Sequence, residues 1–351
     1  MDNNTVADLV RLKTEPVAIE SVERQFSITP GLQEKYGPQG KARSVEDARH
    51  NLSSLADAIE LDSPPMFTSY VSWLSILLNR LGLNPEHLVR HFEILETILA
   101  GEMPGQAAGI ISEYIKEGMK HAGTGKEADN TLIDDDNPHR DLAARYLSLL
   151  LKGKKNEASS LIVSRADQGM PVKDIYLHVF QPVQHEIGRL WQTNRLSVGE
   201  EHYATAITQL TISMLYPYIF NTERNGLKMI STTVSSELHE LGIRMVTDLF
   251  ESEGWDTWFL GANTPAESII KLMKEHQPDI LAISVTLPGH IKRMQNLACA
   301  IKEKRPENTK IIVGGQAFRD VPGAWIKKHA DGYSDNAGMA LSMVYNLIGK
   351  S

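Results

Sequence analysis

The chain is poor in cysteine and carries no excess of positive charge. Among its 351 residues Cys299 is the single cysteine, so an intramolecular disulfide and a multi-cysteine metal site are both excluded. Lys and Arg number 36 against 44 Asp and Glu, which gives a formal net charge of -8, and the basic residues form no block. Helix-turn-helix and zinc-finger patterns are also missing. We therefore expect no direct binding to nucleic acid.

Long apolar runs are missing as well. None reaches the roughly 18 residues that a membrane-spanning helix needs. The opening segment, MDNNTVADLVRLK, has no apolar core of signal-peptide length. These two absences predict a cytoplasmic protein that does not act in a membrane. What is present, 42% hydrophobic and 23% charged residues, is typical of a folded globular chain, and the length favours two or three domains.

Residues 1–122 form the first predicted region, which is helical after a polar and loosely ordered start. Phe67, Val71, Leu74 and Leu78 recur at helical spacing, and Gly82 ends that helix. A second helix then begins, with Asn84 as its N-cap and Pro85 in its first position. Residues 123–138, which are first rich in glycine and then acidic, lack any period and are predicted to be a linker.

The remainder of the chain changes from helices to alternating strands and helices. Residues 139–222 read as four or five antiparallel helices with a break near Pro182, which indicates a helical bundle. Residues 226–351 contain the apolar runs LKMISTTV, WDTWFLG, DILAISVTL and KIIVGG, and helical patterns follow at 241–252, 265–276 and 291–304. We therefore predict an all-α part followed by an α/β part, a flavodoxin-like (Rossmann-like) parallel sheet.

A histidine follows the first of these strands, in the stretch ELHELG. Neutral imidazole is a good ligand for a transition metal such as cobalt, so His239 is the candidate metal ligand. Glu237 could accept the other ring N–H. Gly242 leaves room for a bulky ligand near the backbone. Ser284 and Gly314–Gly315 follow the third and fourth strands at the same sheet edge, which suits a long polar tail. The alternative for His239 is a solvated loop histidine.

In this order, E-x-H-x-x-G, then SVT at 284–286, then Gly314–Gly315, the chain resembles the cobalamin-binding domain family. That family has D-x-H-x-x-G in its commonest form, so Glu237 keeps the carboxylate one methylene further out. The resemblance implies that His239 is the lower axial ligand of cobalt and displaces the dimethylbenzimidazole of the cofactor. It also implies that the helical bundle covers the upper face of the corrin.

A second pattern lies in the bundle, where Trp191 is followed after nine residues by Glu201 and His202. It resembles the W-x9-E-H motif of CarH-type light sensors. The resemblance implies that these three residues shield the upper face of adenosylcobalamin. Alternatively, Trp191 is a core aromatic residue of the bundle and His202 a satisfied interior histidine. Gln192 stands where such sensors can carry a second cobalt-binding histidine, and His178 and His185 are the candidate substitutes.

The bundle and the preceding helical region also resemble photocobilins, which hold a bilin beside the cobalamin. A bilin such as biliverdin needs an apolar cleft and cations for its propionates. Candidate contacts are Tyr70, Trp73, Arg80, His87, Arg90 and His91. Their alternative is a helix core with a solvated charged face. Cys299 lies on a predicted helix of the C-terminal region, so a bilin would be held noncovalently.

Together these patterns predict a light sensor that is not an enzyme. Light would break the cobalt–carbon bond, and the bundle would change its contact with a regulatory protein partner or within a homo-oligomer. Two alternatives share the same cobalt site. One is a methyl-carrying corrinoid protein of a methyltransferase system, and the other is a cobalamin-binding antirepressor that does not respond to light.

Overall fold

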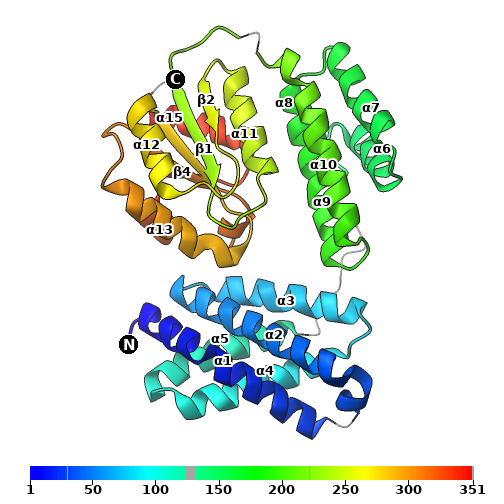
Figure 1. Ribbon diagram of the computed structural model, residues 1–351, viewed down its shortest axis with the longest axis vertical. Coiled ribbons are helices and arrows are strands. Elements are labelled where there is room, and N and C mark those ends of the chain that lie inside the picture. Colours follow the sequence, from blue (N-terminus) through cyan, green and yellow to red (C-terminus); the bar gives the residue numbers. More distant parts are fainter. Residues whose placement is uncertain (30, 123–130, 221, 350–351) are drawn as a thin grey trace. The chain divides into compact units, whose positions relative to one another are not determined.

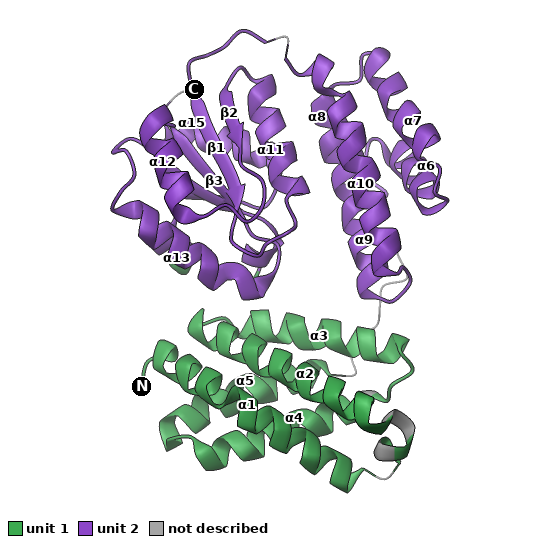
Figure 2. Cartoon of the chain, viewed as in Figure 1, with its two compact units in different colours: residues 1–127, 320–325 green, residues 128–319, 326–351 purple. Residues whose placement is uncertain are grey.

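The computed structural model describes residues 1–29, 31–122, 131–220 and 222–349. The chain divides into two compact units, which are described separately (Figure 2). Unit 1 contains residues 1–127 with 320–325, and unit 2 contains residues 128–319 with 326–351. Within the described part of the chain, no helix is both long and apolar enough to cross a membrane.

The helical part of unit 1 consists of five helices (Figure 1), which are α1 (Asn3–Ile28), α2 (Leu32–Glu60), α3 (Pro64–Arg80), α4 (Pro85–Glu102) and α5 (Gly105–His121). The predicted N-cap of the fourth is confirmed, because the side chain of Asn84 accepts a hydrogen bond from the backbone N–H of Glu86 at 3.0 Å. Helix α5 packs closely on α3. A Cβ added to Gly118 would lie 2.8 Å from the ring of Phe67.

The prediction that this region begins with a loosely ordered segment is wrong. Helix α1 begins at Asn3, and the carboxylate of Asp2 caps it by accepting from the backbone N–H of Thr5. Its sequence looks polar because few of its residues are large and apolar. It nevertheless buries one face, formed by Val6, Ala7, Val10, Val17, Ala18 and Val22. That narrow apolar stripe packs mainly on α2, so tertiary contact stabilises a helix with weak periodicity.

The helical bundle of unit 2 follows residue 131. Its elements are α6 (Arg140–Leu151), α7 (Lys155–Asp167), α8 (Val172–Ile175), the π-helix η1 (Tyr176–Phe180), α9 (Gln181–Gln192), α10 (Val198–Met214) and the 3-10 helix η2 (Tyr216–Tyr218). The predicted break near Pro182 is wrong, because α8, η1 and α9 follow one another without a non-helical residue. A π-helical turn precedes Pro182, and the carbonyl of His178, four residues earlier, accepts from the side-chain amide of Asn137 at 2.8 Å in place of the missing N–H. Ser197 and Glu200 form a capping box that starts α10. Of the predicted linker, residues 123–130 lie outside the described residues.

The second part of unit 2 is a five-stranded, all-parallel sheet with helices on both faces (Figure 1), as predicted. Its strands are β1 (Lys228–Thr233), β2 (Asp256–Phe259), β3 (Ile280–Ser284), β4 (Lys310–Gly314) and β5 (Gly332–Ser334). Its helices are α11 (Leu241–Ser252), α12 (Ala266–His276), α13 (Ile291–Lys302) and α15 (Ala337–Leu347), with 3-10 turns η3 (Pro288–His290) and η4 (Gln316–Phe318). Helix α14 (Gly323–His329) begins in unit 1 and enters unit 2 at Ile326. The short strand β5 and the helices beside it were not singled out in the sequence.

The strand order, β2-β1-β3-β4-β5, is the flavodoxin-like one. The order reverses between β1 and β3, which are neighbours in the sheet. Ligands of open α/β sheets bind at this switch point. The ladder places Thr233 opposite Ser284, and Ser284 opposite Gly314, in one row along that edge. The predicted site residues at the sheet edge therefore belong to neighbouring strands.

Candidate functional site

The loop after β1 carries a fully buried carboxylate. The hydroxyl of Thr233 donates to the backbone carbonyl of Glu237 at 3.0 Å, which ties the loop to the strand end. The side chain of Glu237 is 0% exposed. A buried carboxylate is stable only when its oxygens are hydrogen-bonded. The partners of Glu237 therefore define the site.

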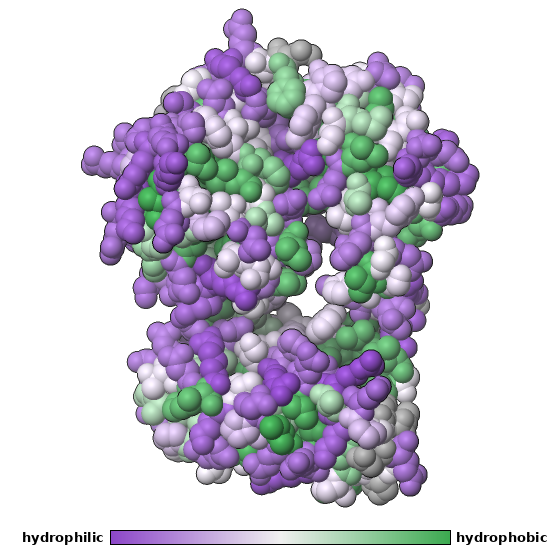
Figure 3. Space-filling view, viewed as in Figure 1, coloured by the Kyte–Doolittle hydropathy of each residue, from purple (hydrophilic) through white to green (hydrophobic). Residues whose placement is uncertain are grey.

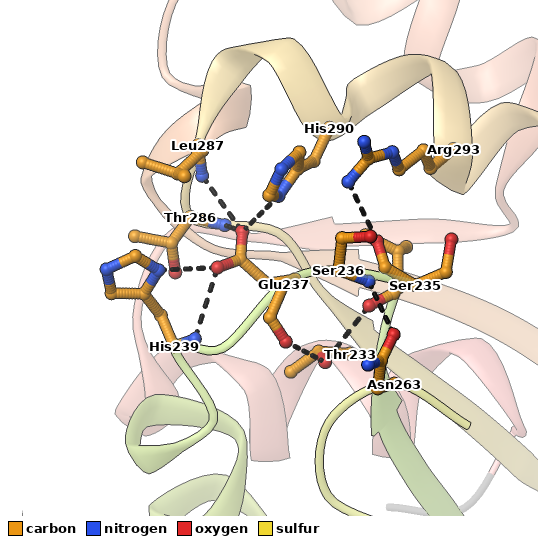
Figure 4. A network of polar contacts seen from close by, with 11 residues as sticks. Thr233, Ser235, Ser236, Glu237, His239, Asn263, Thr286, Leu287, His290 and Arg293 are labelled. Carbon is orange, nitrogen blue, oxygen red and sulfur yellow. Dashed lines mark hydrogen bonds and ion pairs between the residues drawn. The ribbon is translucent and has the colours of Figure 1, made fainter.

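Five N–H groups surround this carboxylate (Figure 4). Oε1 accepts from Nδ1 of His239 at 2.5 Å and from the backbone N–H of the same residue at 3.1 Å. Oε2 accepts from the backbone N–H groups of Thr286 and Leu287 at 3.0 and 3.1 Å, and from Nδ1 of His290 at 3.0 Å. Burial alone would raise the pKa of Glu237, but these hydrogen bonds outweigh it and hold the pKa at about 2. The carboxylate is therefore ionised and acts only as an acceptor.

The ionised carboxylate decides the tautomer of His239. Because Glu237 can only accept, Nδ1 of His239 carries a proton, and Nε2 has a free lone pair whenever the ring is neutral. The side chain of His239 is 51% exposed, whereas that of Glu237 is fully buried. The bond to Glu237 raises the pKa of His239, burial opposes it, and the nearby carboxylates of Glu237 and Glu201 add to the rise. This is the arrangement of a ligating histidine whose second nitrogen is held by a carboxylate.

The predicted glycines divide into two kinds. At Gly242, in the first turn of α11, an added Cβ would meet no atom of the described residues within 4 Å, so the protein interior does not require a glycine there. At Gly314 an added Cβ would lie 2.8 Å from the carbonyl oxygen of Ser334. At Gly315, which has a φ of +105°, it would lie 2.2 Å from the carbonyl oxygen of Val285. Packing of neighbouring strand ends explains this pair, whereas Gly242 borders open space.

The predicted upper-face residues lie on two bundle helices. Trp191 is in the last turn of α9 and is 41% exposed, which does not fit a core aromatic. Glu201 and His202 are in the first turn of α10, where Nδ1 of His202 binds Oε2 of Glu201 at 2.5 Å. The other oxygen of Glu201 accepts from the hydroxyl of Thr205 at 3.0 Å. The structure brings Glu201 within electrostatic range of His239, while the His202 side chain is 74% exposed.

Three large apolar side chains on these elements are exposed. They are Leu238 beside the candidate ligand and, two or more turns beyond Glu201 on α10, Leu210 and Met214. In the space-filling view, apolar surface lies over the bundle helices amid polar surface (Figure 3). Exposed apolar surface of this kind marks a ligand or partner site more often than an ordinary surface. Leu238, next to His239 and 74% exposed, fits contact with a corrin, which is a large and mostly apolar ring.

The remaining candidates lie elsewhere. Within the bundle, burial, together with the charge of Arg319, lowers the pKa of His185, and His178 lies on η1 with its ring 5.8 Å from that of His139. In unit 1, the hydroxyl of Tyr70 donates to Asn51 at 2.8 Å. Burial lowers the pKa of His91 to about 4, and its Nδ1 lies 3.0 Å from Oε1 of Gln25. Trp73, Arg80, His87 and Arg90 lie on α3 and α4.

His290 is the site residue that the sequence did not reveal. It ends the 3-10 turn after β3, and its side chain is 14% exposed. A polar residue a few positions beyond a buried strand, at the edge that already carries His239, is the signal that could have found it. Within the described residues, no group of three or more His, Cys, Asp or Glu could hold a metal ion. A single histidine suffices for a corrin, since the ring itself supplies the equatorial ligands.

Comparisons with known families agree with this geometry. The family model described as the B12 binding domain matches residues 227–342, the sheet and its helices. A second B12 binding domain model matches residues 142–216, the bundle. Together they span more than half of the chain and support a cobalamin-binding family. The cofactor that these domains support is a cobalamin, as predicted.

The curated relatives are mainly corrinoid proteins. Dimethylamine corrinoid protein 1 of Methanosarcina mazei is 23% identical over 199 residues, which are 55% of this chain and 90% of that protein. A corrinoid protein of Desulfitobacterium hafniense is 21% identical over 208 residues, 57% of this chain and 94% of that protein. The solved structure of the Methanosarcina barkeri monomethylamine corrinoid protein shares the fold, with a TM-score of 0.53 at 16% identity, over 60% of this chain and 99% of that one.

The prediction that this chain is a light sensor is wrong. The CarH repressor of Myxococcus xanthus is a weaker match, 20% identical over 215 residues, which are 61% of this chain and 69% of that protein. The dimethylamine corrinoid proteins match more strongly and over nearly their full length. The motif specifies only three residues, Trp191, Glu201 and His202, and so it carries little information about function. The adenosyl group and the bilin were expected with the sensor, and the comparisons support neither.

Proposed function

We propose that this chain is a cobalamin-binding methyl carrier that serves a partner methyltransferase. The observation that carries the proposal is the orientation of His239. Its Nδ1 donates to a fully buried carboxylate, which leaves Nε2 to bind a metal from a side chain that is 51% exposed. The similarity to dimethylamine corrinoid proteins over bundle and sheet supports the carrier role. When bound, the corrinoid supplies a cobalt centre that accepts and gives up a methyl group.

The residues of this chain divide the remaining tasks. His239 would bind cobalt from below, and Glu237 holds its ring and keeps its proton on Nδ1. The strand-end row of Thr233, Ser284 and Gly314 would border the nucleotide tail, because it lies at the switch point of the sheet. Gly242 leaves space at the start of α11.

The bundle would cover the opposite face of the corrin. Trp191 offers exposed apolar surface that would exclude water, and Glu201 places a carboxylate near the site. The reaction chemistry would then belong to the methyltransferase, while this chain positions the cofactor. A partner protein and a cytoplasmic location are parts of the same proposal. The methyl group replaces the adenosyl group that the sequence suggested.

The first experiment tests cobalt ligation. Protein labelled uniformly with ¹⁵N is loaded with cobalamin and reduced to the Co(II) state, and its EPR spectrum is compared with that of unlabelled protein. Ligation by His239 predicts that labelling changes the superhyperfine pattern of the axial nitrogen. His239→Ala should lose this change, and His276→Ala, remote in sequence on α12, should keep it. An unchanged pattern on labelling of the native protein would refute the ligand assignment.

The second experiment tests the carrier role. The loaded protein is reduced with a strong reductant and exposed to isotope-labelled methyl iodide, and methyl transfer to a thiol acceptor is followed with and without a candidate methyltransferase. We expect the label to stay on the protein until the methyltransferase is added. A protein that binds cobalamin but does not take up the label would contradict the carrier role while leaving the cobalt site intact.

A further inference from the structure

We propose that His290 is a positioning residue that sets the donor strength of the cobalt ligand through Glu237. The inference rests on the proposed function, because it assumes that His239 binds cobalt. It goes beyond it by assigning a role to a second histidine on a different loop. His290 comes from the turn after β3, whereas Glu237 and His239 come from the loop after β1.

The two histidines bind opposite oxygens of one carboxylate (Figure 4). Nδ1 of His239 lies 2.5 Å from Oε1 of Glu237, and Nδ1 of His290 lies 3.0 Å from Oε2. Glu237 is 0% exposed and His290 is 14% exposed, so solvent weakens the bond between these two residues little.

The other neighbours of the carboxylate decide the direction of both bonds. The backbone N–H groups of Thr286, Leu287 and His239 all donate to it. Glu237 thus faces donors on both of its oxygens and accepts from each histidine. Nδ1 of His290 must therefore carry a proton, whatever the state of its Nε2.

This geometry couples His290 to the lone pair of His239. Each N–H that donates to a carboxylate withdraws electron density from it and makes it a weaker acceptor for the remaining donors. With His290 in place, Glu237 pulls less strongly on the Nδ1 proton of His239, and Nε2 is a weaker donor. Without it, the ring of His239 gains imidazolate character and binds a metal more strongly. Thr286 and Leu287 donate through the backbone, so among the three donors to Oε2 only His290 can be changed by substitution.

The arrangement therefore makes a prediction about redox chemistry. An axial ligand stabilises Co(II) but not Co(I), which takes no axial ligand, so a stronger donor lowers the Co(II)/Co(I) potential. His290→Phe removes the N–H and keeps a planar ring. We expect its midpoint potential to shift to a more negative value, with cobalamin still bound through His239. His290→Gln, which restores an N–H donor, should return the potential towards that of the native protein.

The measurement is spectroelectrochemical titration of the cobalamin-loaded full chain, with EPR to show that His239 remains bound. His276→Phe is the matched control, because it makes the same exchange on α12, where the histidine stacks on Trp258. His290→Leu repeats the test with a smaller side chain if phenylalanine prevents folding. The role of His290 is overturned if His290→Phe or His290→Leu keeps the His239 ligand but has a Co(II)/Co(I) midpoint potential equal to or above that of the native protein. Native protein without a histidine signal in EPR overturns the ligand assignment itself and this inference with it.

Discussion

Glu237 accepts two hydrogen bonds from one residue, His239, through the same oxygen. The ring nitrogen lies 2.5 Å and the backbone nitrogen 3.1 Å from Oε1. One bond holds the turn of the loop and the other holds the rotation of the imidazole, and both depend on the same oxygen. The carboxylate itself is held by the loop after β3. The orientation of the candidate ligand thus depends on two loops that are about fifty residues apart in the sequence.

Glu237→Gln should impair both stability and cobalamin binding. A glutamine side chain keeps the size of Glu237 but must turn N–H groups towards N–H donors, which leaves buried groups unpaired. We expect a loss of about 1–3 kcal/mol in the free energy of unfolding. We also expect cobalamin to bind roughly 10–100-fold more weakly. Urea unfolding and binding titrations measure the two effects. Glu253→Gln, on an exposed turn, is the control and should change neither.

Gly242→Ala should separate binding from stability. An added Cβ meets no described atom within 4 Å, and alanine suits a helix better than glycine. The free energy of unfolding should therefore stay equal or rise by up to about 1 kcal/mol. If the open space belongs to the corrin, cobalamin should bind at least about tenfold more weakly, a difference of ~1.4 kcal/mol. Unchanged affinity would show that the cofactor does not approach Gly242.

Gly315→Ala should behave in the opposite way and destabilise the fold. Its backbone has a φ of +105°, and the new Cβ would lie 2.2 Å from the carbonyl oxygen of Val285. Strain at such a position and the clash together predict a loss of about 2–3 kcal/mol in the free energy of unfolding. Thermal unfolding without cofactor is the measurement. A melting temperature equal to that of the native protein would contradict the close approach of the two strand ends.

Asp248→Asn should stabilise the protein above the acidic range. Asp248 is buried on α11 and accepts a hydrogen bond from the hydroxyl of Tyr176 at 2.8 Å. Burial raises its pKa from 3.8 to about 6, although the bond from Tyr176 and the charge of Arg244 oppose the rise. The folded state thus prefers the protonated form, so this contribution to stability is complete below pH 3.8 and is lost as the pH rises through about 6.

An asparagine in this position stays neutral and can still accept from Tyr176. Well above the folded pKa, the variant should be more stable by up to about 3 kcal/mol, because each pKa unit corresponds to ~1.4 kcal/mol. At a pH below both pKa values the difference should vanish. Asp135→Asn, whose side chain is 91% exposed, should show no such pH dependence. Equal stabilities of the native protein and Asp248→Asn across the whole range would contradict the raised pKa.

Much of the α/β part could be predicted from local patterns. The three helices expected at 241–252, 265–276 and 291–304 lie within two residues of α11, α12 and α13, because an amphipathic period and flanking strands mark both ends. The segment Asn3–Ile28 could not be predicted in the same way. Its buried face consists of small and β-branched residues, and only packing on α2 shows that this face is apolar enough.

The function of the bundle motif could not be inferred from its residue types. Trp191, Glu201 and His202 are compatible with several uses of an upper face, and similarity over the whole bundle and sheet contradicts the light sensor. For His290, in contrast, no sequence pattern marked the residue at all. Its part in the site follows from a contact at 3.0 Å between two loops.

By itself, the sequence determined the parallel sheet, the position of His239 at the end of its first strand and the identity of the cobalamin-binding family, since these depend on periodicity and on the order of short motifs. Only the tertiary structure decided how the histidine is held. Five N–H groups from two loops converge on one buried carboxylate, and such convergence depends on the register of β1 and β3, which separation along the chain does not reveal.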